Sequence, residues 1–91
     1  MQSQAVLKGF GIVVLDRGFV YVGETMHDGE WCIIRNAVNI RYWGTKRGLG
    51  QLALEGPTPE TILDPVGTVR APARAVISIL DTDAKLWKQG Q

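Results

Sequence analysis

The segment that decides the fold is residues 11–35, which read GIVVLDRGFVYVGETMHDGEWCIIR. Runs of β-branched and aromatic residues predict short strands at 11–16, 19–24 and 30–35, because such side chains suit a pleated, half-buried surface. The Asp-Arg-Gly and His-Asp-Gly sequences between these runs predict tight turns, and Asp-Gly is typical of a primed hairpin turn. We therefore expect this segment to form an antiparallel meander.

After the meander the hydrophobic pattern changes from strand to helix. A fourth short strand is expected within residues 36–44. Leu49, Leu52 and Ala53 are then spaced as on one face of a helix. Gly56-Pro57 predicts the end of this helix, because glycine favours the position after the last helical residue and proline cannot continue the helix.

The remaining elements complete a mainly β chain. Two further strands are expected, near 66–70 and over 73–80, followed by a helical turn within 81–87 that begins with an Asp/Thr cap and carries Trp87. Short strands with a single helix in a chain of 91 residues predict a small SH3-like barrel or a strongly curved antiparallel sheet with one short helix. A sheet with the helix packed on one face is the two-layer alternative. The chain 1–91 is expected to be one domain, with flexible ends at 1–9 and 88–91.

Alternation within these elements also predicts the core. Its expected members are Ile12, Val14, Val20, Val22, Ile34, Leu52, Ile77 and Ile79. A 91-residue chain with 45% hydrophobic residues and three tryptophans has difficulty burying its apolar surface alone. We therefore expect a homo-oligomer.

Composition limits the possible classes of protein. The single Cys32 excludes an intrachain disulfide, and with one histidine a Cys/His zinc site within one chain is also excluded. No run approaches the roughly 18 apolar residues that a membrane span needs, and the N-terminal residues do not resemble a signal peptide. A cytoplasmic location without a membrane partner is expected.

Candidate catalytic groups are few. His27 lies beside a predicted turn and is expected to be an exposed turn residue. Cys32 alternates with apolar residues, has no expected histidine neighbour, and is predicted to be a buried, inert thiol. The nine carboxylates show no spaced pair that would serve acid–base chemistry or a magnesium site. We predict a noncatalytic protein without a metal or a cofactor.

The best candidate for a ligand site lies in residues 39–56, which read NIRYWGTKRGLGQLALEG. Between Trp31 and Leu54 there are four basic residues and no acidic one. A glycine-rich turn that leads into a helix leaves backbone N–H groups free to bind an anion, although neither the Walker nor the dinucleotide spacing of glycines is present. The predicted ligand-binding residues are Arg41, Tyr42, Trp43, Thr45, Lys46, Arg47, Gly48 and Gly50.

Each type of side chain in this set has an expected role. Tyr42 and Trp43 would stack a base, and Arg41 would pair with a phosphate. An anion pocket at the helix start would be completed by Thr45, Lys46 and Arg47. In the structural alternative, one of the two aromatic residues is part of the core, Thr45 caps the helix, and the basic residues are solvated.

Two further patterns carry a resemblance. Ala37, Ile40 and Trp43 form an Ala-x-x-Ile-x-x-Trp stretch, and residues 49–56 form a Leu-x-x-Leu-Ala-x-x-Gly helix. With the opening meander and the closing apolar strand, they make most of the chain similar to a group of small uncharacterised proteins encoded by tailed phages and prophages. The resemblance implies a location in the cytoplasm of the host cell, where small noncatalytic phage proteins often interfere with host defence.

One class of such anti-defence proteins sequesters nucleotide immune signals, usually as oligomers with pockets at subunit interfaces. The stretch 41–50 would suit such a pocket, so the first function expected is a sponge for an anionic, nucleotide-like small molecule. Two alternatives stay open: a nucleic-acid-binding barrel and a protein-interaction or assembly module. The nucleic-acid track would use Arg35, Arg41, Lys46, Arg47, Arg70 and Arg74, although a net charge of +1 counts against it. An exposed apolar patch without a pocket would favour the interaction module.

Overall fold

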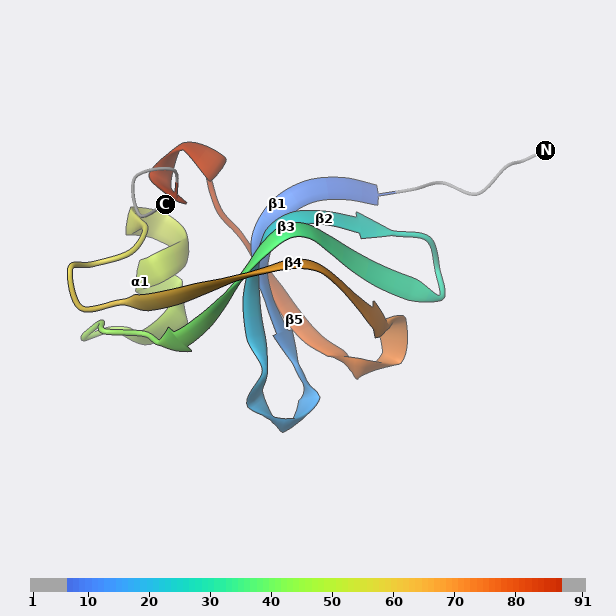
Figure 1. Ribbon diagram of the computed structural model, residues 1–91, viewed down its shortest axis with the longest axis horizontal. Helices are drawn as coiled ribbons and strands as arrows, with labels where there is room; N and C mark the ends of the chain where they lie inside the picture. Colours follow the sequence, from blue (N-terminus) through green and yellow to red (C-terminus); the bar gives the residue numbers. More distant parts are fainter. Residues whose placement is uncertain (1–6, 88–91) are drawn as a thin grey trace.

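The computed structural model describes residues 7–87, which form one antiparallel sheet of five strands in the order β4-β3-β2-β1-β5 (Figure 1). The elements, in chain order, are β1 (Leu7–Leu15), η1 (Asp16–Gly18), β2 (Val20–His27), β3 (Trp31–Tyr42), α1 (Gly48–Glu55), β4 (Ile62–Pro72), η2 (Ala73–Ala75), β5 (Val76–Asp81) and η3 (Ala84–Trp87). The η elements are short 3₁₀ helices. The prediction of a mainly β fold with one short helix is confirmed.

The curved sheet is open rather than closed into a barrel. Within residues 7–87, β4 and β5 lie at the two edges and do not pair with each other. The helix α1 packs on one face at one end of the sheet, beside η3. The structure therefore combines two of the expected architectures: the strongly curved sheet, and the two-layer arrangement in which the helix packs on one face of the sheet.

The predicted meander is formed by β1, β2 and β3. Ile12 lies opposite Val22 in the register of β1 and β2, and His27 lies opposite Cys32 in the register of β2 and β3. The strand β1 already begins at Leu7, which pairs with His27, so part of the expected flexible segment 1–9 belongs to the sheet. The expected flexible segment 88–91 lies outside the described residues.

A bulge joins the two strands that the sequence predicted at 30–35 and within 36–44. Asn36 has a positive φ of 51°, and the register shifts by one residue opposite Gly23, so β3 bends without ending. A Cβ on Gly23 would lie 2.8 Å from the carbonyl oxygen of Arg35. Glycine is therefore needed where the two strands approach each other at the bend.

Apolar residues on both faces of the sheet build two clusters. One cluster lies between the sheet, α1 and η3, and contains Ile12, Val20, Val22, Val38, Ile40, Leu52, Ala53 and Trp87. The other contains Val13, Leu15, Cys32, Ile34, Ala37 and Ala71. Neighbours in one strand, such as Ile12 and Val13, belong to different clusters because successive side chains point to opposite faces.

Most of the predicted core is buried, with one clear error. Ile12, Val20, Val22, Ile34 and Leu52 are buried, while Val14 and Ile79 are half-buried against the two clusters. Ile77 was wrongly predicted, because its side chain is 65% exposed. Val14 pairs with Ser78 and Leu15 pairs with Val76, which leaves Ile77 as the extra residue of a bulge on the edge strand β5.

The later elements differ from expectation mainly in length. The strand predicted near 66–70 is the longer β4, and the strand predicted over 73–80 begins only at Val76, after the turn η2. The helix α1 ends as predicted: Gly56 has a φ of 82°, and its N–H donates to the carbonyl oxygen of Leu52 at 2.8 Å. None of the helices in the described part of the chain is long and apolar enough to cross a bilayer.

The predicted C-terminal turn docks against α1 through a buried indole. Asp83 caps η3 by accepting the N–H of Lys85 at 2.9 Å. The Trp87 side chain is buried, and its Nε1–H donates to Thr82 Oγ1 at 3.0 Å. Thr82 Oγ1 in turn donates to the carbonyl oxygen of Ala53 at 2.6 Å, so this relay ties η3 to the helix that borders the candidate site.

Candidate functional site

The predicted ligand-binding segment joins the end of β3 to the start of α1, at the left of Figure 1. A second loop, between α1 and β4, holds it in place. Thr58 Oγ1 donates to the carbonyl oxygen of Gly44 at 2.8 Å, and Thr61 Oγ1 donates to that of Trp43 at 2.7 Å. Gly44 has a φ of 66°, and a Cβ there would lie 2.6 Å from the backbone of Glu60. The two loops therefore touch backbone to backbone, which only glycine permits.

The start of α1 is capped by a residue that sequence reasoning missed. Gln51 Oε1 accepts the backbone N–H of Lys46 at 3.2 Å and that of Arg47 at 3.0 Å. A glutamine in the first turn of a helix commonly reaches back in this way, so the capping role of Gln51 could have been predicted from its position in the sequence. The expectation that these N–H groups are free for an anion is thus wrong for two of them. Thr45 does not cap the helix either, because its Oγ1 donates to the carbonyl oxygen of Gly48 at 3.1 Å.

Both arginines of the segment are already in ion pairs. Arg41 Nε lies 2.7 Å from Asp64 Oδ2, and this hydrogen bond raises the pKa of the Arg41 guanidinium. Arg47 pairs with Glu55 at the end of α1. The acids come from β4 and from the far end of the helix, so the local excess of positive charge in the sequence is compensated in three dimensions. Lys46 is in neither of these pairs.

The two neighbouring aromatic side chains are on the surface. Tyr42 is 57% exposed and Trp43 is 42% exposed, so the alternative in which one of them belongs to the core is wrong. Tyr42 lies opposite Ile62 in the register of β3 and β4. The indole of Trp43 lies beside the helix start, where its Cζ3 would be 3.8 Å from a Cβ on Gly48.

A hollow of about 350 Å³ lies between the two loops and the helix start, and we call it the Tyr42 hollow. It is lined by Tyr42, Gly44, Thr45, Lys46, Gln51, Thr58, Pro59 and Glu60. Three of the predicted ligand-binding residues therefore meet: Tyr42, Thr45 and Lys46. The others do not line the hollow: Arg41, Trp43, Arg47, Gly48 and Gly50.

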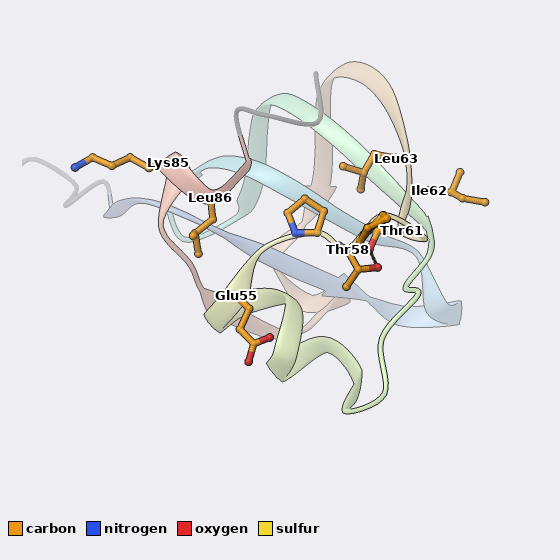
Figure 2. A pocket seen from close by; sticks show the side chains of 9 residues that line it. Glu55, Thr58, Thr61, Ile62, Leu63, Lys85 and Leu86 are labelled. Carbon is orange, nitrogen blue, oxygen red and sulfur yellow. Dashed lines mark hydrogen bonds between the residues drawn. The ribbon is translucent and has the colours of Figure 1, made fainter.

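A larger hollow of about 690 Å³ lies on the other side of the loop between α1 and β4 (Figure 2). It is lined by Glu55, Pro57, Thr58, Pro59, Thr61, Ile62, Leu63, Lys85 and Leu86, none of which was predicted as a site residue. Figure 2 shows the Lys85 side chain extending away from the hydroxyls of Thr58 and Thr61. Both hydroxyls already donate to backbone carbonyl oxygens, which leaves this hollow without a free polar donor at its centre.

The only histidine of the sequence lies beside its only cysteine. His27 Nε2 is 3.7 Å from Cys32 Sγ, because the antiparallel register across the hairpin turn places the two residues opposite each other. The expectation of no histidine neighbour is therefore wrong, and His27 is half-buried at the end of β2. Burial raises the pKa of the Cys32 thiol, which keeps it protonated and weakly nucleophilic.

Acidic and metal-binding side chains do not gather in the region from Leu7 to Trp87. Within it, no group of three or more His, Cys, Asp or Glu side chains is close enough to hold a metal ion. Comparisons of the chain with protein-family models, curated proteins and solved structures found no match. Function is therefore argued from the geometry of the site.

Proposed function

We propose that this protein is a noncatalytic binding protein that holds a nucleotide-type ligand in the Tyr42 hollow. The observation that carries the proposal is the exposed Tyr42 at a hollow that Lys46 also lines. The volume of the Tyr42 hollow, about 350 Å³, lies within the range of small-molecule sites, roughly 300–1,000 Å³. An exposed aromatic face stacks a base of any sequence, and a lysine contacts a phosphate.

The charges of the lining favour a ligand of low charge. Lys46 and Glu60 both line the hollow and offset each other. A monophosphate or a cyclic phosphodiester therefore fits better than a triphosphate. Arg41 does not line the hollow, and its Nε is paired with Asp64 at 2.7 Å. The phosphate contact predicted for Arg41 therefore needs this side chain to move when a ligand binds.

The biological role in this proposal follows from the sequence resemblance and not from the geometry. A phage-encoded binder in the host cytoplasm that sequesters a nucleotide immune signal needs high affinity and no turnover. A hollow with an aromatic wall and no assembled catalytic group is compatible with that role.

Calorimetric titration with cyclic dinucleotides, cyclic trinucleotides and ADP-ribose derivatives tests the proposal. For the ligand that binds, Tyr42→Ala should remove the stacking contribution of about 1–3 kcal/mol, and Lys46→Gln a charge-assisted contact of about 1.5–3 kcal/mol. The matched control is Lys85→Gln, which removes a lysine from the neighbouring hollow and should leave affinity unchanged. No binding across the panel, or equal losses in Lys46→Gln and Lys85→Gln, would contradict the proposal.

A specific observation favours one second candidate, the protein-interaction module. Tyr42 and Ile62 form an exposed cross-strand pair beside the exposed Trp43, and aromatic residues are enriched at protein interfaces. Ile62→Thr separates the two functions, because it should weaken a protein partner while leaving a nucleotide in the Tyr42 hollow unaffected. The nucleic-acid track gains no such support, since two of its members, Arg41 and Arg47, are ion-paired.

A further inference from the structure

Both edges of the sheet are protected against pairing with another strand. The edge strand β4 contains Pro65 and Pro72, has a bulge at Val66, and places Gly67 at a φ of 86°. The opposite edge, β5, has six residues and a bulge at Ile77. Prolines and bulges interrupt the ladder that an added strand needs. An oligomer of this chain therefore has to use side-chain surfaces.

One such surface is a groove at the end of the sheet away from α1, which we call the Trp31 groove. It has a volume of about 480 Å³ and is lined by Gly29, Glu30, Trp31, Pro72, Ala73 and Arg74. Trp31 is 43% exposed and lies opposite Pro72 in the register of β3 and β4. The N–H of Ala73 donates to the carbonyl oxygen of Glu30 at 2.8 Å, which fixes the two turns that form the groove walls.

The chemistry of the Trp31 groove selects its occupant. Aromatic side chains are enriched at protein interfaces, and a partner segment that is already held rigid loses little entropy on binding. Arg74 is exposed and takes part in neither ion pair of the described chain, while Glu30, which also lines the groove, would repel a carboxylate placed beside it. The groove therefore fits a rigid segment that presents an apolar residue to Trp31 and a carboxylate to Arg74, away from Glu30.

The chain itself carries such a segment at its other end. Residues 57–60 lie in the loop between α1 and β4, where the N–H of Thr61 donates to the carbonyl oxygen of Thr58 at 3.1 Å and closes a tight turn. Pro59 and Glu60 are exposed. In Figure 1 this loop lies at the far left, whereas η2 and the end of β4 lie at the right. Glu60 belongs to neither ion pair of the described chain. We propose that the Pro57–Glu60 loop of one copy binds in the Trp31 groove of a second copy, with Pro59 against Trp31 and Glu60 paired with Arg74.

This contact joins two different surfaces, so it is head-to-tail. Such an association produces a ring if its rotation closes and a filament if it does not. It also bears on the Tyr42 hollow, because Pro59 and Glu60 line that hollow as well. Pairing with Arg74 of the next copy neutralises Glu60 and leaves Lys46 as the uncompensated charge, which favours an anionic ligand. This last consequence rests on the proposed function, whereas the association does not.

Charge reversal tests the pairing by sedimentation velocity over a series of protein concentrations. The wild type should associate in a concentration-dependent manner. Arg74→Glu alone and Glu60→Arg alone should each weaken association by about tenfold or more, because each places like charges together. An equimolar mixture of the two variants should restore it, since every contact again joins opposite charges. The matched control is Arg17→Glu, the same charge change in η1, which should have no effect.

A second variant tests the apolar half of the contact. Trp31→Ala should weaken association by about thirtyfold, as for an aromatic hot spot. A wild type that stays monomeric at every concentration would overturn the proposal. So would a mixture that fails to associate when both variants keep the wild-type melting temperature. Nucleotide titration of the same samples reports on the Tyr42 hollow separately, so loss of assembly and loss of ligand binding are distinguishable.

Discussion

Replacing Gln51 should change stability and anion binding in opposite directions. In the wild type, Gln51 Oε1 accepts the N–H groups of Lys46 and Arg47 at the start of α1. Gln51→Ala removes this cap, and losing a cap costs about 0.5–2 kcal/mol. The higher helix propensity of alanine returns a few tenths of a kcal/mol. A net loss of about 1 kcal/mol lowers the melting temperature of a domain of this size by about 4–8 °C.

The same change frees two N–H groups at the rim of the Tyr42 hollow, which Gln51 lines. Backbone N–H groups at a helix start bind anions, and a hydrogen bond to a charged group is worth about 1.5–3 kcal/mol. Affinity for pyrophosphate should therefore rise by about tenfold in Gln51→Ala. Gln51→Glu should do the reverse. Its carboxylate makes stronger, charge-assisted bonds to the same N–H groups, which stabilises the helix start, and it repels an anion from the hollow.

Urea denaturation of the three proteins and calorimetric titration with pyrophosphate measure both effects. The expected order of stability is Gln51→Glu, then wild type, then Gln51→Ala, and the expected order of affinity is its inverse. Equal stability of Gln51→Ala and wild type would show that the cap does not form. Equal affinity of all three proteins would show that the helix start takes no part in anion binding, whatever the ligand of Tyr42.

Three further changes test other parts of the molecule. Gly44→Ala should destabilise by about 2–4 kcal/mol in urea denaturation, because a Cβ would lie 2.6 Å from the backbone of Glu60 at a φ of 66°; a loss under about 0.5 kcal/mol would mean that the loops separate freely. Thr82→Val should cost about 1–3 kcal/mol by leaving the buried Trp87 Nε1–H unpaired, while Thr82→Ser should stay close to wild type. Asp28 Oδ1 accepts the N–H groups of residues 30 and 31, which lowers the pKa of its carboxyl below 3.8. The stability this adds is present above pH 3.8 and is lost as the pH falls through the lowered value. Asp28→Ala should therefore reduce stability at neutral pH and make the melting temperature fall less steeply as the pH is lowered. An unchanged acid dependence of the melting temperature would exclude this role.

The strand and helix pattern could be predicted from the sequence because alternation and helical spacing are local properties. Val20, Val22 and Ile34 are buried as their alternation predicted, and Leu52 as the helical stripe predicted. The bulge at Ile77 could not be predicted in the same way. A bulge depends on which residue of β1 faces which residue of β5, and that register joins parts of the chain more than sixty residues apart. Its effect is to move one apolar side chain to the surface without any change in composition.

The electrostatics of the candidate site likewise depend on contacts between distant parts of the chain, which local sequence patterns do not predict. The sequence located the aromatic pair next to a helix start, since both follow from the neighbouring residues of one segment, but it left open whether one of the two rings belongs to the core. It overestimated the positive charge, because Asp64 reaches Arg41 from β4 and Glu60 reaches the Tyr42 hollow from the α1–β4 loop. Asp64 arrives through the pairing of β3 with β4, and Glu60 through the hydrogen bonds that tie the α1–β4 loop to residues 43 and 44. A count of charges along the chain contains neither of these contacts. A charge excess within one segment therefore predicts an anion site only when the strands and loops that contact that segment are known to bring no carboxylate. Nucleotide titration of the Glu60→Arg variant measures how far the Glu60 carboxylate opposes an anionic ligand.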